Sequence, residues 1–352
     1  MSVGSVSSST LSGILQNTVS RLQSQMTTLE TESSTGLLAD IGQTLGADTG
    51  QDVAMHQQTA DLAAITSSNA LVTAQLSTAS DALTSLQTSS QSLLAQLVQG
   101  QTSTPSSTGA RAIQQTAAGA LQSFASSMNA NAGGQYVFGG INSGVAPIAS
   151  YAQSPTSAAQ TAVDNAFQAT FGMAITSASV NTISGTAMTS FLDNQFAALF
   201  TGSNWTSTWS SASDTTQANR IGVNETATTS ISANQSAFQT MAQALTMVSE
   251  FGGLNLASDA YSALMSKAQS VMNDANSGLI EASAAVGTMQ NQVTQADSAI
   301  TLQQNVLTTQ INAKESVNSY DVVSQVSNLS TQLQTAYSLT AQIHKLSLVS
   351  FL

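Results

Sequence analysis

The feature that most constrains the fold is an unbroken heptad repeat between residues 62 and 97. Seam positions recur there in alternating steps of three and four over five heptads, which is the period of a helix that packs along one seam. These positions are Leu62, Ile65, Asn69, Val72, Leu76, Ala79, Leu83, Leu86, Ser90, Leu93 and Leu97. The repeat predicts a helix about 50 Å long. We favour a core within one chain for this seam, with an intermolecular coiled coil as the alternative.

Further helices are expected on both sides of the middle of the chain. A second helix, which includes Ile113 to Met128, has apolar residues on one face. The C-terminal third has a shorter helix that ends at Gly252. A very long helix follows, with Ser258 as its N-cap. Gly278 and Gly287 each weaken it by about 1 kcal/mol relative to Ala. The expected seam positions are Ile113, Ala117, Leu121, Phe124 and Met128, then Tyr261, Leu264, Ala268, Val271, Ala275, Leu279, Val286, Val293, Ile300 and Leu307.

Residues 135–230 follow a different pattern. Both tryptophans, Trp205 and Trp209, lie here, and one stretch alternates at period two as a half-buried strand does. Its alternating positions are Phe167, Ala169, Phe171, Met173 and Ile175. The pattern predicts a small mixed or β-rich domain inserted between two helical arms.

The predicted fold is mainly α, a rod built from both ends of the chain as a long antiparallel helical bundle or coiled coil. Residues 1–45 and 312–352 form a terminal helical assembly segment. Residues 46–134 and 231–311 form the long helical bundle, and residues 135–230 form the insert. This layout places both termini at one end of the rod and the insert at the other.

The two terminal segments also have apolar seams, but we expect few neighbours for them within the chain. An isolated helix pair buries too little surface to offset its ordering entropy. We therefore predict that they pack between subunits, since such heterologous contacts repeat into rings or open helices. The alternative is a coiled coil between the two segments that closes a monomer. The predicted assembly residues are Leu11, Leu15, Leu22, Met26, Leu29, Val322, Val326, Leu329, Leu333, Ile343, Leu346, Leu348 and Leu352.

The charge balance excludes several classes of partner. The chain has 6 Lys and Arg against 18 Asp and Glu, a net charge of −12. So few basic residues argue against binding to nucleic acid or to an anionic membrane surface. No stretch has the 18 or more consecutive apolar residues of a membrane span. We expect no nucleic-acid or membrane partner.

The chain also has few of the residue types that usually act as catalytic groups or metal ligands. The chain lacks cysteine, which excludes disulfides, thiolate ligands and cysteine nucleophiles. Its two histidines are remote from each other in sequence. His56 follows Asp52 by one helical turn, where we expect a surface hydrogen bond rather than a metal site. His344 is expected to be solvated or part of an interface. We predict no enzyme activity, no cofactor and no metal.

Two smaller motifs have structural and functional interpretations. The glycines of Gly133–Gly140 lack the GxxxxGK[ST] pattern of a phosphate loop, so they favour a hairpin or turn that docks on the bundle. Trp205 and Trp209, four residues apart, favour the anchor of a small core. The alternative for this pair is stacking on a ligand such as a sugar.

Three stretches resemble the flagellin superfamily, and within it the proteins of the hook–filament junction. Glu32–Gly36 is similar to the Ser/Thr-Gly turn after the first helix of this family, without the Arg that often precedes it. Gly134–Gly140, followed by Pro147, resembles a Tyr-x-Phe-x-Gly … Pro segment. Gln342–Leu352 resembles a Ser-Leu-x-x-aromatic-Leu ending. The resemblance covers roughly residues 1–140 and 230–352.

The resemblance implies an extracellular structural subunit of the bacterial flagellum. Such a subunit is exported unfolded through the type III channel, with an export chaperone and an uncleaved N-terminal signal. It assembles with itself, between the first hook-associated protein on the hook side and flagellin on the filament side. The alternatives are a filament flagellin of the same superfamily, or a secreted adhesin or binding module that uses residues 141–230.

Overall fold

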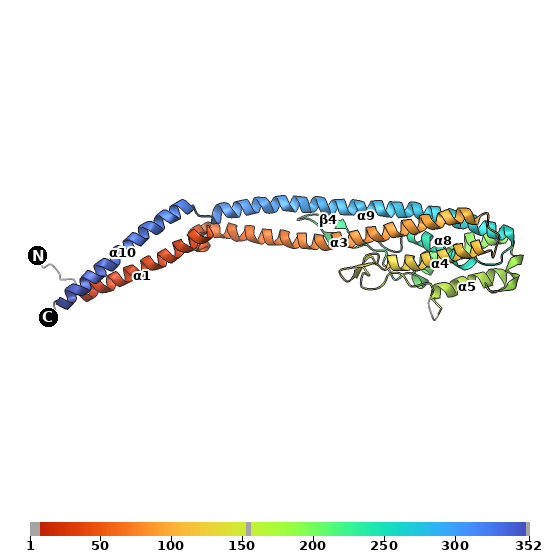
Figure 1. Cartoon of the computed structure of the whole chain (residues 1–352), viewed down its shortest axis with the longest axis horizontal. Coiled ribbons are helices and arrows are strands. Elements are labelled where there is room, and N and C mark those ends of the chain that lie inside the picture. The colour runs from red at the N-terminus through yellow and green to blue at the C-terminus, as the bar shows by residue number, and fades with distance from the viewer. Residues whose placement is uncertain (1–7, 153–155, 350–352) are drawn as a thin grey trace. The chain divides into compact units, whose positions relative to one another are not determined.

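The computed structural model of the chain describes residues 8–152 and 156–349, with the side chains of 8, 9 and 344–349 left out. Its elements are mainly helical, so the predicted mainly α fold with a small mixed domain in the middle is confirmed (Figure 1). The chain divides into two compact units. The terminal unit comprises residues 1–62 and 301–352, and the central unit comprises residues 63–300.

In the terminal unit, α1 (Ser8–Thr35) and α10 (Ser319–Val349) lie side by side and run in opposite directions (Figure 1). Thr35 ends α1 because Gly36 adopts a left-handed conformation with φ of +72°. After Gly36 the chain passes through α2 (Ile41–Leu45) and a 3₁₀ turn (Gly46–Asp48) into the next long helix.

Two backbone crossovers meet in this unit. One connects α1 to α2, and the other connects α9 (Ser258–Glu315) to α10. The Leu38 N–H donates to the Glu315 carbonyl over 2.8 Å, and the Val317 N–H donates to the Gly36 carbonyl over 3.0 Å. The crossovers therefore bind each other through backbone hydrogen bonds.

The central unit is built on α3 (Thr49–Gly100) and α9, which run antiparallel. The Gln87 amide donates to Ser283 Oγ over 2.9 Å, and the Asn69 amide donates to Asp297 Oδ1 over 2.7 Å. Every heptad position from Leu62 to Leu97 is buried, polar Asn69 and Ser90 included, and so is every predicted seam position of α9. The prediction of an intramolecular core is thus confirmed for this seam.

Two further helices complete the bundle: α4 (Thr108–Met128) and α8 (Ser236–Phe251) pack against each other beside α3 and α9 (Figure 1). The predicted face of α4 is buried from Ile113 to Met128. The helix α9 begins at Ser258 and continues through Gly278 and Gly287 without a break. Because its apolar face is buried along the bundle, packing overrides the low helix propensity of the two glycines.

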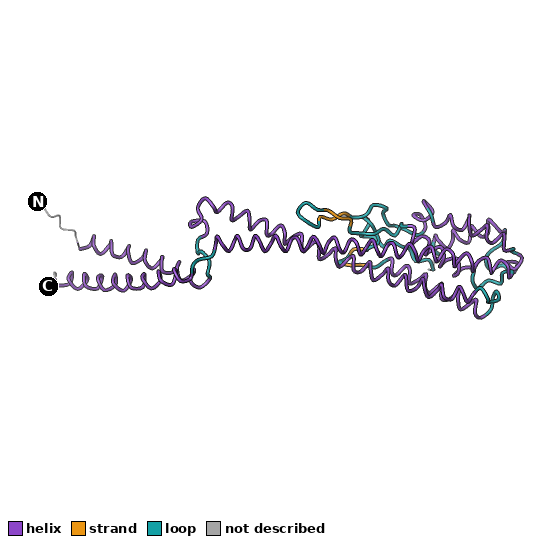
Figure 2. The backbone as a smooth tube through the Cα atoms, turned by 90° about the horizontal axis from the view of Figure 1, so that it is seen from above, coloured by secondary structure: helices purple, strands orange, loops and turns teal. Residues whose placement is uncertain are grey.

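The insert contains more helix than the sequence pattern predicts. It has α5 (Ala158–Phe171), α6 (Gly185–Phe191) and α7 (Gly202–Thr208), together with short helical segments. These segments are Ala178–Thr182, Leu192–Phe196 and Ala197–Phe200. Its strands form two short antiparallel ribbons, orange in Figure 2, β1 (Asn131–Ala132) with β2 (Gln135–Tyr136) and β3 (Ala218–Arg220) with β4 (Thr226–Thr228).

The strand predicted over residues 167–175 is wrong, because Phe167 lies in α5. The Ser157 side chain accepts from the Gln160 N–H and caps the start of this helix, and Gly172 ends it in a left-handed conformation. Ala159, Val163 and Phe167 recur every four residues and are its buried face. The period-two alternation therefore does not mark a strand: Phe167, Ala169 and Phe171 lie in the last turns of α5, and Met173 and Ile175 follow its end.

Candidate assembly interface

The predicted assembly residues whose side chains are described lie on α1 and α10, the two helices that pack against each other. Leu22 and Val322 are buried, whereas Leu11 is exposed by 41%. The others with described side chains are half-buried: Leu15, Met26, Leu29, Val326, Leu329, Leu333 and Ile343. Leu352 and the side chains of Leu346 and Leu348 lie outside the described residues. The seam is thus incompletely covered within one chain.

The closed pairing of the two terminal segments, which the sequence left as the alternative, is present in the structure. The two helices contact each other along their lengths, and the Gln23 side-chain amide donates to Tyr337 Oη over 2.7 Å. A two-helix pair can shield only the line where the helices touch. Contacts between subunits stay a prediction for these residues.

Six of the described large apolar side chains on the terminal helices, Leu11 of the predicted seam among them, are strongly exposed. Tyr320 is exposed by 83%, the most of any large hydrophobic residue described. The others on these two helices are Leu11, Ile14, Val323, Tyr337 and Leu339. Exposed apolar side chains of this kind are candidates for contacts with another molecule. We call these six residues the outer apolar set.

Apart from Leu11, the members of the outer apolar set were missed by heptad analysis because most of them lie beside the seam positions. Val323 directly follows the seam residue Val322, and Ile14 directly precedes Leu15. A search for a second apolar stripe on the same helix would have found them. A shallow groove of about 330 Å³ runs between the helices and includes Leu15, Leu22, Ala336 and Leu339 among its lining residues.

The hairpin predicted at Gly133–Gly140 is confirmed. Asn131 pairs with Tyr136 across β1 and β2, and the next residues, Val137 and Phe138, are buried against the bundle. Phe138 meets Phe238 of α8 edge to face, with ring centroids 5.5 Å apart. At Gly140, with φ of +59°, an added Cβ would lie 2.6 Å from two backbone carbonyl oxygens. The glycine is therefore required by close backbone approach and has no role in phosphate binding.

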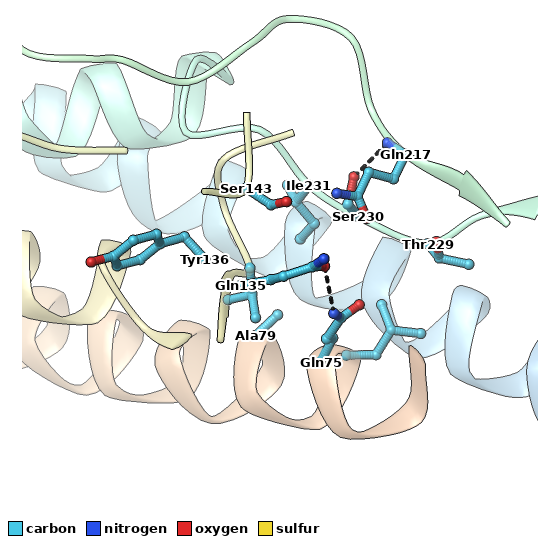
Figure 3. Close-up of a pocket in the computed structure, with 11 residues that line it drawn as sticks. Gln75, Ala79, Gln135, Tyr136, Ser143, Gln217, Thr229, Ser230 and Ile231 are labelled. Carbon is cyan, nitrogen blue, oxygen red and sulfur yellow. Dashed lines mark hydrogen bonds between the residues drawn. The ribbon is translucent and has the colours of Figure 1, made fainter. Parts of the chain in front are cut away.

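A small cavity lies where this hairpin meets α3 (Figure 3). Its volume of about 10 Å³ is at the lower limit for one water molecule. The Gln75 amide donates to Gln135 Oε1 over 3.0 Å, and the Gln217 N–H donates to Ser230 Oγ over 2.7 Å. The first hydrogen bond joins α3 to the hairpin, and the second joins the two chain segments that flank β3 and β4. The cavity is therefore part of the packing.

The tryptophans of the insert belong to its core. Trp205 and Trp209 are buried and stack with centroids 5.6 Å apart, and the Trp205 indole N–H donates to Asn234 Oδ1. Tyr151 stacks on the other side of Trp209 at 5.2 Å. The predicted core anchor is confirmed, and the alternative of a sugar-stacking pair is wrong because neither ring has an exposed face.

A cavity of about 260 Å³ lies next to this core, between α4, α8 and Tyr151. Burial raises the pKa of Glu250, the one carboxylate among the described residues that line the cavity. Acid–base catalysis of the usual kind needs groups with separate roles held close together. A single carboxyl group does not supply them, and we assign this cavity no reaction.

His56 has more partners than the surface hydrogen bond that the sequence predicts. Its Nε2 donates to Glu315 Oε1 over 2.7 Å and lies 3.9 Å from Asp52 Oδ2. The hydrogen bond to Glu315 raises the pKa of His56 above its ordinary value. Asp52 and Glu315 are both buried. Sequence spacing identified Asp52 but not Glu315, which follows it by more than 250 residues.

Comparison with known proteins gives the family. The bacterial flagellin N-terminal helical region matches residues 6–143, and the bacterial flagellin C-terminal helical region matches residues 269–352. No curated protein matches the chain by sequence. Across the described helices none has both the length and the hydropathy of a membrane span.

A solved structure from Vibrio parahaemolyticus, provisionally described as a flagellar hook-associated protein, has a similar fold. The TM-score is 0.52 at 10% sequence identity, over 76% of this chain and 97% of that chain. At this identity the likeness is one of fold. The two flagellin regions cover well over half of the sequence and include both helices of the terminal unit, so this chain belongs to the flagellin superfamily.

Proposed function

We propose that this flagellar structural protein is a subunit of the hook–filament junction, and that copies assemble through α1 and α10. In this role it contacts the first hook-associated protein on the hook side and flagellin on the filament side. The observation that carries the proposal is the incomplete burial of the terminal helix pair. Its seam is half-buried, and its outer apolar set is exposed.

Assembly accounts for this exposed surface. Each copy offers the outer apolar set to a neighbour, and repeated contacts between unlike surfaces generate a ring or an open helix. The described part of α1 carries few charges, Arg21, Glu30 and Glu32 among them, so shape and apolar contact dominate over ion pairs. Exposed ion pairs contribute little in any case. Assembly is therefore expected to depend only weakly on salt.

Two observations favour the junction over the filament itself. The fold is similar to almost the whole of the Vibrio chain described as a hook-associated protein. The segment Gly134–Gly140 that resembles junction proteins forms a docked hairpin with Phe138 fully buried. Filament flagellin remains the alternative. Export unfolded, with a chaperone, is consistent with a chain that lacks cysteine.

The location test uses cells in which the gene is deleted and isolated hooks are viewed by electron microscopy. A junction subunit predicts bare hooks and flagellin released into the medium. Complementation with the full chain restores filaments, whereas a chain lacking residues 322–352 does not. Immunogold labelling of the full chain should give one band at the distal end of the hook. Filaments on hooks of the deletion strain, or label along the filament, would contradict the junction role.

Point variants separate assembly from folding. Ile14→Ser combined with Val323→Ser removes two members of the outer apolar set, and should abolish assembly while the helical content stays unchanged. The matched control is Ile280→Ser, which changes a residue 55% exposed on α9 of the central unit. The control should assemble as the wild type does. Equal assembly of both variants would show that the terminal surface is not the interface.

A further inference from the structure

Three side chains able to bind a metal ion meet where α3 begins and α9 ends. Asp52 and His56 lie one helical turn apart and so share a face of α3. Glu315 is the last residue of α9. One ligand atom from each of the three lies within 4.8 Å of the other two.

The charges in this cluster are unbalanced. Asp52 is 2% exposed, and its Oδ1 atom is buried without a hydrogen-bond partner. Glu315 is 6% exposed, and both carboxylates face the single ring of His56. Even when His56 is protonated, the two carboxylates and the imidazolium ring together have a net charge of −1. Lys314, the basic residue next to Glu315, does not balance this charge, because its Nζ forms an ion pair with Asp48 Oδ2 at 3.3 Å.

We propose that Asp52, His56 and Glu315 bind one divalent first-row transition-metal ion of the zinc type. An imidazole with two carboxylates suits such ions, whereas Ca²⁺ and Mg²⁺ prefer oxygen ligands alone. The metal occupies the space between the three side chains and replaces the proton on His56 Nε2, with Asp52 Oδ2 and Glu315 Oε1 as the carboxylate oxygens that face this nitrogen. Rotation of the Asp52 carboxylate, or binding through both of its oxygens, also brings the unpartnered Oδ1 to the ion. Because His56 is 53% exposed, water completes the coordination from the solvent side.

The geometry requires little adjustment. Zinc bonds of about 2.0–2.2 Å place neighbouring ligand atoms roughly 3 to 3.5 Å apart. Nε2 now lies 2.7 Å from Glu315 Oε1 and 3.9 Å from Asp52 Oδ2, on either side of that range. Rotations within the side chains therefore suffice, and the backbone can stay in place.

The site would join α3 to the crossovers that lead into α1 and α10. The carbonyl of Glu315 already accepts from the Leu38 N–H in this region. A metal held by the Glu315 side chain attaches the same residue to α3 as well. Because the metal binds the folded form, it stabilises the terminal unit by an amount that grows with the logarithm of the ion concentration once that concentration exceeds the dissociation constant.

The first experiment is calorimetric titration of untagged full-length protein with ZnCl₂ at pH 7.5. We expect one ion per chain. Asp52→Asn and Glu315→Gln should each weaken binding at least about tenfold, as loss of a metal ligand does. The matched control is Asp48→Asn, an exposed acid outside the cluster, which should change affinity less than about twofold. Circular dichroism checks that each variant is folded.

The second experiment needs no variant, because the chain has two histidines. Addition of Co²⁺ to the wild type should broaden or shift the imidazole NMR signals of His56 and leave those of His344 unchanged. The proposal is overturned if ZnCl₂ at 1 mM, which is about the weakest affinity of interest, gives no heat of binding. It is also overturned if folded Asp52→Asn and Glu315→Gln bind as the wild type does, or if His344 responds in place of His56.

Discussion

The central and terminal units use the same heptad spacing but reach different degrees of burial. In the central unit every seam position of α3 from Ile65 to Leu97 is buried. In the terminal unit, Leu22 and Val322 are buried and the other described positions of the predicted seam are half-buried or exposed. The spacing therefore predicts which face of a helix is apolar. It does not predict how many neighbours that face has.

The number of packing partners explains the difference. In the central unit α3 and α9 are accompanied by α4, α8 and the hairpin, and the buried residues form one continuous cluster. In the terminal unit α1 has α10 as its main partner. A pair of helices leaves most of each apolar stripe in contact with water. A second copy is the partner that we propose for the remaining surface.

The largest expected effect is the loss of a core aromatic residue in the central unit. Phe251 is fully buried and packs on Phe167, Phe191 and Phe196. Phe251→Ala should lower the free energy of unfolding by about 3–5 kcal/mol, because it leaves a cavity. Urea unfolding followed by tryptophan fluorescence measures this unit, since Trp205 and Trp209 both lie in it.

The matched change in the terminal unit is Leu329→Ala. Leu329 is half-buried, so the monomer should lose roughly 1 kcal/mol of local stability. Hydrogen exchange of α10 measures this loss. If Leu329→Ala destabilised the monomer as much as Phe251→Ala does, the two units would have equally complete cores and the comparison would fail.

An intermediate effect is expected at two left-handed glycines, one in each unit. A Cβ at Gly140 would lie 2.6 Å from the carbonyl oxygens of Ser213 and Thr215, whereas a Cβ at Gly36 meets nothing within 4 Å. Gly140→Ala should cost about 2–3 kcal/mol, from backbone strain and displacement together. Gly36→Ala should cost about 1 kcal/mol, the conformational penalty alone. Chemical denaturation measures the loss of stability in Gly140→Ala, and hydrogen exchange measures it in Gly36→Ala. Equal losses in the two variants would contradict this prediction.

The smallest expected effect concerns Glu250, whose carboxyl group is largely shielded from solvent in the central unit. Burial raises the pKa of Glu250 in the folded state, so its stabilising contribution is complete below the unfolded pKa and is lost as pH rises through the folded value. Glu250→Gln should therefore gain stability relative to the wild type between about pH 4.5 and neutral pH. The control variant is Glu30→Gln, which removes an exposed carboxyl group from α1. Parallel profiles for wild type and Glu250→Gln would contradict this explanation.

Much of the helical framework could be predicted from the sequence. Period and seam position identified α3, α4 and α9, because each has a one-sided apolar face long enough to distinguish helix from strand. The hairpin was predicted from the glycines of the Gly133–Gly140 segment. The domain boundaries at residues 45, 134, 230 and 311 remain predictions.

Other features depend on contacts that sequence spacing does not reveal. Five alternating residues around Phe167 suggested a strand because short apolar runs fit both periods, and the capping by Ser157 and Gly172 decided for helix. Glu315 joins His56 only because α9 returns antiparallel to α3. A search for a second apolar stripe would have found the residues of the outer apolar set, but their exposure was established only when the position of α10 showed which side of α1 is covered.

The most direct test of the central claim is hydrogen exchange on the dilute monomer and on the assembled form. We predict that amides of α1 and α10 exchange much faster than those of residues 62–97 in the monomer, and become protected on assembly. Terminal helices that are already as protected as residues 62–97 in the monomer, with no change on assembly, would contradict the account.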